Sequence, residues 1–194
     1  MALNATALPR CCPPGATVFL TWRLYGALPR GWCDRARALP DSGHAFAQTD
    51  RLLDMANRGP LWLRDQRIAS LVAIALELGE RHQLYDRFAW VVMPNHVHVV
   101  MRPHRPMPVV MKYIADATEG PANRLLGRSG NPFWQRETYE RCIHTADEFH
   151  RVVQYVEHNP VRANLARSKA DWTWSSAGLW QTRAQRHAAA AGQP

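Results

Sequence analysis

Two histidines with one residue between them are the clearest candidate for chemistry in this sequence. His96 and His98 lie in WVVMPNHVHVVM, the stretch from Trp90 to Met101, in which residues 93–95 form a turn-like break between two apolar runs. Side chains two residues apart on a strand point to the same face of a sheet. The pair therefore has two readings, either a two-residue grip on a metal ion or ordinary surface histidines on a strand.

A tyrosine and an asparagine further along the chain favour the metal reading. The segment from Glu148 to Leu165 has apolar residues at helical spacing, and Tyr155 and Asn159 are four residues apart within it, on one face. Pro160 follows directly, so we expect the helix to end or kink at Asn159. We expect Asn159 to complete a three-ligand site with the two histidines, and Tyr155 to stand beside the metal as a nucleophile.

The sequence resembles the single-tyrosine HUH transposases, and most closely the REP-associated tyrosine transposases. The resemblance rests on MPNHVHVV with YVEHNPVRANL, together with four further blocks in the family's order between Pro13 and Ala177, namely PPGATVFLTWRL, GPLWLRD, ANRLLGRSGNPFWQRETYER and DWTWSSA. It implies that His96, His98 and Asn159 hold a divalent metal. It also implies that Tyr155 cuts single-stranded or hairpin DNA through a covalent 5′-phosphotyrosine.

The donor types and the basic residues extend this expectation. Neutral imidazole with an amide oxygen suits Mg²⁺ or Mn²⁺, because zinc sites more often carry Cys or three His. Lys112 and Arg124 match basic family positions, so the resemblance implies DNA contact there. Arg136 and Arg162 are further candidate DNA contacts, with helix capping as a second reading for Arg162.

Other functions and other nucleophiles stay open at this point. A domesticated relative could bind DNA hairpins without cutting them. A two-histidine phosphoesterase would need two separate H-x-Thr/Ser elements, and this chain has one HVH. Tyr113 and Tyr139 are alternative nucleophiles, but neither has a ligand-type residue four positions later.

Composition agrees with a nucleic-acid partner. The formal net charge is +8 with a sequence pI of about 9.9, and 22 of the 24 basic residues are Arg. Cys11, Cys12, Cys33 and Cys142 form no metal-binding spacing and predict no disulfide framework, which fits a reducing cytosol. No segment is long and apolar enough for a membrane span, so we expect a cytoplasmic protein. The sequence leaves open whether the chain is a monomer or a homodimer.

The elements that must position these residues predict an α+β fold. Strands are expected at 17–24, 85–92, 96–101 and within 132–143, and helices at 46–56, 63–82, 109–117, 121–126 and before Pro160. This order is a ferredoxin-like βαββαβ antiparallel sheet with helices on one face, plus a C-terminal helix carrying the tyrosine. We expect a flexible arm at 1–14, one domain at 15–177 with an insertion at 26–59, and a disordered tail at 178–194.

Overall fold

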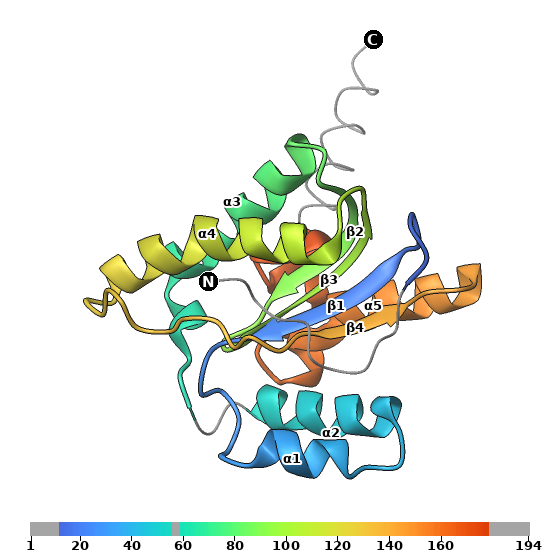
Figure 1. Ribbon diagram of the computed structural model, residues 1–194, viewed down its shortest axis with the longest axis horizontal. Helices are drawn as coiled ribbons and strands as arrows, with labels where there is room; N and C mark the ends of the chain where they lie inside the picture. Colours follow the sequence, from blue (N-terminus) through green and yellow to red (C-terminus); the bar gives the residue numbers. More distant parts are fainter. Residues whose placement is uncertain (1–11, 56–58, 179–194) are drawn as a thin grey trace.

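A four-stranded antiparallel sheet forms the centre of the computed structural model, which describes residues 12–55 and 59–178 (Figure 1). The strand order is β2-β3-β1-β4, so β3 and β1 are the two inner strands. The predicted arm and tail lie mostly outside the described residues, because residues 1–11 and 179–194 are not described. The strands are β1 Val18–Arg23, β2 Tyr85–Val92, β3 His96–Pro103 and β4 Tyr139–Cys142.

The chain order confirms the ferredoxin-like prediction. One α-helix, α3, connects β1 to β2, and another, α4, connects β3 to β4, which gives βαββαβ. A further helix, α5, follows β4, and the predicted insertion contributes α1 and α2. The helices are α1 Trp32–Arg37, α2 Ser42–Met55, α3 Gln66–Arg81, α4 Met107–Leu125 and α5 Ala146–Arg162, with short 3₁₀ turns at Trp62–Arg64 and Lys169–Asp171.

The two faces of the sheet bury different sets of residues, as the alternation along β3 requires. Val97, Val99 and Met101 join the larger core beneath α3 and α4, whereas Val100 joins a smaller core with Val156 of α5. Figure 1 shows α3 and α4 across one face, α5 on the other, and α1 with α2 packed at one end. His96 and His98 share the face of Val100, so they point toward α5.

Two helix ends predicted at prolines were wrong. Pro121 does not divide the fourth helix, because α4 runs unbroken through it, and α5 continues past Asn159 and Pro160 to Arg162. A proline inside a helix removes one hydrogen bond and crowds the preceding turn. Here burial outweighs that cost, since Ala122, directly after Pro121, and Pro160 are both buried.

The end of α5 is set by Asn164 instead. This residue has a positive φ of 55°, the left-handed conformation that follows many helices. The Leu165 N–H donates to the Pro160 carbonyl at 2.8 Å and the Asn164 N–H donates to the Val161 carbonyl at 3.0 Å. This pair of bonds is a Schellman motif, which satisfies carbonyls that the helix end would leave without donors.

The cysteine prediction was also wrong. Cys12 and Cys142 form a disulfide with their Cα atoms 5.6 Å apart, and Cys33 is the free thiol in the described part of the chain. Cysteine spacing carried no hint of this bond, because the partners are 130 positions apart and meet only when the segment before β1 lies beside β4. Across 12–55 and 59–178, no helix combines the length and apolar character that a membrane crossing needs.

Candidate metal and tyrosine site

The histidine pair lies at the start of β3, completely buried. The Nε2 atoms of His96 and His98 are 3.0 Å apart, and the Thr21 hydroxyl lies 2.7 Å from Nδ1 of His98. The tight turn before β3, closed by a hydrogen bond from the Met93 N–H to the His96 carbonyl, fixes where the strand begins. The two imidazoles therefore point to the same side of the sheet, as the sequence predicted.

Asn95 determines which nitrogen of His96 carries the proton. Its side-chain Nδ2 donates to the Leu53 carbonyl at 3.1 Å, so its Oδ1 is left to accept from Nδ1 of His96 at 2.7 Å. Burial lowers the pKa of His96 to about 3, so the ring is neutral. A neutral imidazole with its proton on Nδ1 presents the Nε2 lone pair to the site, as a metal ligand must.

Asp50, which the sequence analysis missed, completes a group that could hold a metal ion. It lies on α2, is 1% exposed, and places Oδ1 at 3.1 Å from Nε2 of His98 and 3.9 Å from Nε2 of His96. Neighbouring ligands of a Mg²⁺ or Mn²⁺ ion with bonds of about 2.1 Å are about 3 Å apart. Two of the three distances among the ligand atoms of Asp50, His96 and His98 have this spacing, at 3.0 and 3.1 Å, and the third is 3.9 Å.

The protonation of Asp50 also suits a metal. Burial opposes ionisation of its carboxyl group, but the adjacent His98 imidazole and the hydrogen bond from the Tyr155 hydroxyl hold the pKa of Asp50 below the ordinary range. Oδ1 accepts no hydrogen bond from the described residues although it is buried. A buried carboxylate oxygen without a donor is costly, and a cation would satisfy it.

Tyr155 lies beside this group, on the middle of α5. Thr145 caps the start of this helix, because its hydroxyl accepts a hydrogen bond from the Glu148 N–H. The Tyr155 ring packs edge-on against Phe19 and His98, and its hydroxyl donates a hydrogen bond to Asp50 Oδ2. Burial and the Asp50 charge raise the pKa of the Tyr155 phenol, so the resting group keeps its proton.

Arg162 and Asp54 surround the tyrosine on its outer side. The Arg162 guanidinium lies 4.5 Å from the centre of the Tyr155 ring and pairs with Asp50 at 3.4 Å and Asp54 at 3.3 Å. Burial, followed by the Asp50 charge, raises the pKa of Asp54 to about 7. Arg162 thus supplies a fixed positive charge next to the nucleophile candidate.

Asn159, the predicted third ligand, is fully buried one turn after Tyr155. Neither its side-chain oxygen nor its side-chain nitrogen has a hydrogen-bond partner among the described residues. Buried amides are normally hydrogen-bonded, so this unpaired amide calls for a ligand. Its role in metal binding stays a prediction.

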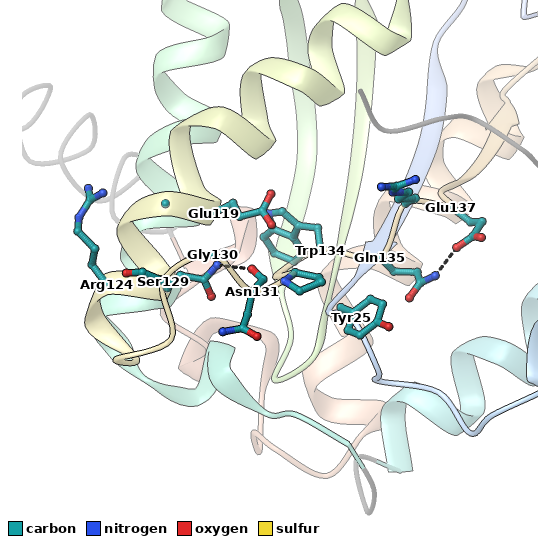
Figure 2. A pocket seen from close by; sticks show the side chains of 13 residues that line it. Tyr25, Glu119, Arg124, Ser129, Gly130, Asn131, Trp134, Gln135 and Glu137 are labelled. Atoms are coloured by element: carbon teal, nitrogen blue, oxygen red, sulfur yellow. Dashed lines mark hydrogen bonds between the residues drawn. The ribbon is translucent and has the colours of Figure 1, made fainter. Parts of the chain in front are cut away.

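The other predicted DNA contacts lie apart from this site. Lys112 is on the exposed side of α4, where it pairs with Asp116 at 2.5 Å. Arg124 and Arg136 border a hollow of about 790 Å³ between the end of α4 and the segment after it. Figure 2 shows Glu119, Trp134 and Tyr25 along this hollow, with Arg124 extending outward at one end.

No short-range signal in the sequence could have pointed to Asp50. It precedes the histidines by more than forty residues and belongs to a segment interpreted as an insertion. The one available hint is that Asp50 and Asp54 are four residues apart on a helix with a partly apolar face, so both carboxylates share one side. That pattern is usually a solvated helix face.

Comparisons with known proteins support the class of fold. No family model and no curated protein matches this chain. The fold described above, a ferredoxin-like antiparallel sheet with helices on both faces, is similar to that of solved structures. One of them is a REP-associated tyrosine transposase bound to a REP hairpin. It is 19% identical, with a TM-score of 0.59, and the match covers 89% of this chain and 82% of that chain. At this identity the likeness confirms the fold.

Proposed function

We propose that this protein is a metal-dependent endonuclease and strand transferase for single-stranded DNA, with Tyr155 as the nucleophile. One observation carries the proposal. The Tyr155 hydroxyl donates to the same carboxylate that faces the buried histidine pair, so nucleophile and metal ligands meet at one point. A nuclease that attacks the phosphate with metal-activated water would need no tyrosine hydroxyl beside the metal ligands.

The proposed ion is Mg²⁺ or Mn²⁺, held by His96, His98 and Asp50, with Asn159 as a further ligand. When bound, a divalent ion offsets negative charge on a scissile phosphate. The residues of the chain do the rest. Asn95 keeps the His96 lone pair directed inward, and Tyr155 is aimed by α5 rather than by a loop. The Arg162 guanidinium is available to a phosphate oxygen on the outer side.

The reaction exchanges one ester for another. The Tyr155 oxygen forms a bond to phosphorus while the bond from phosphorus to the 3′-oxygen breaks. The phenol loses one proton, and the departing 3′-oxygen takes up one proton to become a 3′-hydroxyl. The 5′-phosphotyrosine that results retains the ester, so the reverse reaction can rejoin strands. This is why the proposal includes strand transfer.

Single-stranded or hairpin DNA is the proposed partner. The similar structure holds a REP hairpin, and the net charge of +8 suits a polyanion in the same way. Arg162 lies at the candidate metal site, whereas Lys112, Arg124 and Arg136 lie on and after α4 and would contact DNA away from the cut. We propose a cytoplasmic location, where a protein acting on chromosomal DNA would meet its substrate.

The alternative proposal is a protein that holds DNA hairpins without cutting them. It predicts DNA binding with no covalent product. The two proposals are separated by a gel assay, in which an oligonucleotide labelled on the 3′ side of the cut is incubated with Mn²⁺ and protein and then denatured.

Tyr155→Phe tests the catalytic proposal. The substitution removes one hydroxyl from a packed ring, so we expect DNA binding and Mn²⁺ binding to persist while the labelled protein band disappears. Tyr139→Phe is the matched control from the same face of the sheet, and Tyr113→Phe is the control from α4 on the other face. A band that survives in Tyr155→Phe, or that vanishes only in a control, would assign the nucleophile elsewhere.

A further inference from the structure

Helix α2 is fixed to the site at two places, although it lies in the segment interpreted as an insertion. Phe46 stacks on Tyr139 with ring centres 4.3 Å apart and also contacts Phe19. Further along the helix, Leu53 is buried and its carbonyl accepts from Asn95, the residue that orients His96. The position of Asp50 between these two anchors is therefore set by packing.

The two oxygens of the Asp50 carboxylate have different neighbours. Oδ1 faces the Nε2 atoms of both histidines and has no hydrogen-bond donor among the described residues. Oδ2 accepts from the Tyr155 hydroxyl and lies 3.4 Å from Arg162. The planar Asp50 carboxylate thus contacts the histidine ligands with one oxygen and the nucleophile candidate with the other.

We infer that Asp50 is a positioning residue that joins the metal to Tyr155, with Oδ1 as a metal ligand and Oδ2 holding the tyrosine oxygen beside the ion. This inference rests on the proposed function. It assigns a role to the insertion as well, since α2 then supplies part of the catalytic centre. Asp54, one turn later, holds Arg162 from the other side and so keeps the guanidinium over the tyrosine ring.

Because the two oxygens have different partners, a change at Asp50 should affect both metal affinity and, separately, the rate of adduct formation. A purely structural aspartate would not affect the two quantities separately. Loss of the Oδ1 contact lowers the affinity for the metal ion. Loss of the Oδ2 contact leaves the Tyr155 oxygen without a fixed position even when the metal is bound. Loss of a group that only orients a ligand lowers metal affinity on the order of 10–100-fold, and loss of the ligand itself should lower it at least as much. Misplacement of a reacting group by about 1 Å lowers the rate on the order of 100-fold.

Asp50→Asn, which keeps the shape and removes the charge, is the main test. Mn²⁺ affinity is measured by calorimetry without DNA, and the rate of covalent adduct formation is measured at saturating Mn²⁺. We expect weaker Mn²⁺ binding and, at saturation, an adduct rate that is still reduced. Asp147→Asn, an exposed aspartate on α5, is the charge-matched control and should leave both quantities unchanged.

A second variant covers the case in which Asp50→Asn fails to fold. Asp50→Glu keeps the charge but lengthens the side chain by one methylene, so we expect Mn²⁺ binding to be retained and adduct formation to be slowed. Wild-type Mn²⁺ affinity in Asp50→Asn would overturn the metal contact. A wild-type adduct rate at saturating Mn²⁺ in both variants would overturn the positioning role. If the wild-type protein forms no adduct, the proposed function fails, while the calorimetry still decides whether Asp50 is a ligand.

Discussion

The tautomer of His96 shows how one hydrogen bond outside the ligand set controls the site. Asn95 can satisfy the Leu53 carbonyl and His96 together only if its oxygen accepts from the imidazole. In metal sites, partners of this kind fix ring orientation and raise ligand basicity. Residue 95 belongs to the turn that the sequence predicted, but its link to α2 could not be foreseen.

Asn95→Ala should therefore weaken Mn²⁺ binding about 10–100-fold, because His96 would be free to present a protonated Nε2. Adduct formation should fall at low Mn²⁺ and recover at high Mn²⁺, since Tyr155 and Asp50 are untouched. Calorimetry and a metal titration of the gel assay measure the two effects. Asn131→Ala, an exposed asparagine after α4, is the control, and an unchanged affinity in Asn95→Ala would exclude the orienting role.

How much of the site could be predicted from the sequence depends on how far apart its residues lie. The same-face geometry of His96 and His98 follows from strand periodicity, and the spacing of Tyr155 and Asn159 follows from helical periodicity. Both are local rules. Asp50 reaches the site through tertiary packing of α2, which no periodic pattern describes, and the same holds for the contact of Arg162 with Asp54.

At the scale of whole elements, the strands were predicted well because their apolar runs are short and bounded by turn residues. Tyr85–Val92 matches the predicted range, and β3 starts at His96 as expected. The helix ends were predicted less well. Pro121 and Pro160 were interpreted as stops, but both helices have a buried face that continues across the proline. Propensity is a weak guide when packing favours continuation.

The Schellman end of α5 gives a test at this scale. Asn164→Ala should lower the free energy of unfolding by about 1 kcal/mol, because alanine pays roughly 1–2 kcal/mol in the left-handed region and asparagine less. Asn164→Gly should be neutral or slightly stabilising. Urea denaturation followed by circular dichroism measures both. Gln154→Ala, on the exposed side of α5, is the control, and equal stabilities for Ala and Gly at position 164 would contradict the assigned helix end.

For the whole molecule, the Cys12–Cys142 disulfide connects the segment before β1 to the edge strand β4. A bond between residues so distant in sequence restricts the unfolded chain strongly, and such bonds typically contribute about 2–4 kcal/mol.

Cys12→Ser should accordingly lower the thermal midpoint under oxidising conditions and make it insensitive to dithiothreitol. The wild-type midpoint should fall on reduction to the value of the variant. Cys33→Ser is the control, because Cys33 is a free thiol, and it should keep the response to reduction. Differential scanning fluorimetry with and without reductant measures these midpoints. A wild-type midpoint that does not change on reduction would argue against the disulfide.

The placement of Asp50 on α2 has a consequence for the order in which the protein fails under stress. The sheet and its two main helices supply most of the large core, whereas α2 contributes Leu53 to that core, Phe46 to the smaller core, and a few polar contacts to the site. Parts of a protein with fewer buried contacts open at lower free energy than the whole. Partial opening of α2 would remove Asp50 while the histidines, the tyrosine and the sheet stay in place. In this molecule activity would then be lost at a lower temperature or denaturant concentration than the folded sheet, and it would be the last property to return when the stress is removed.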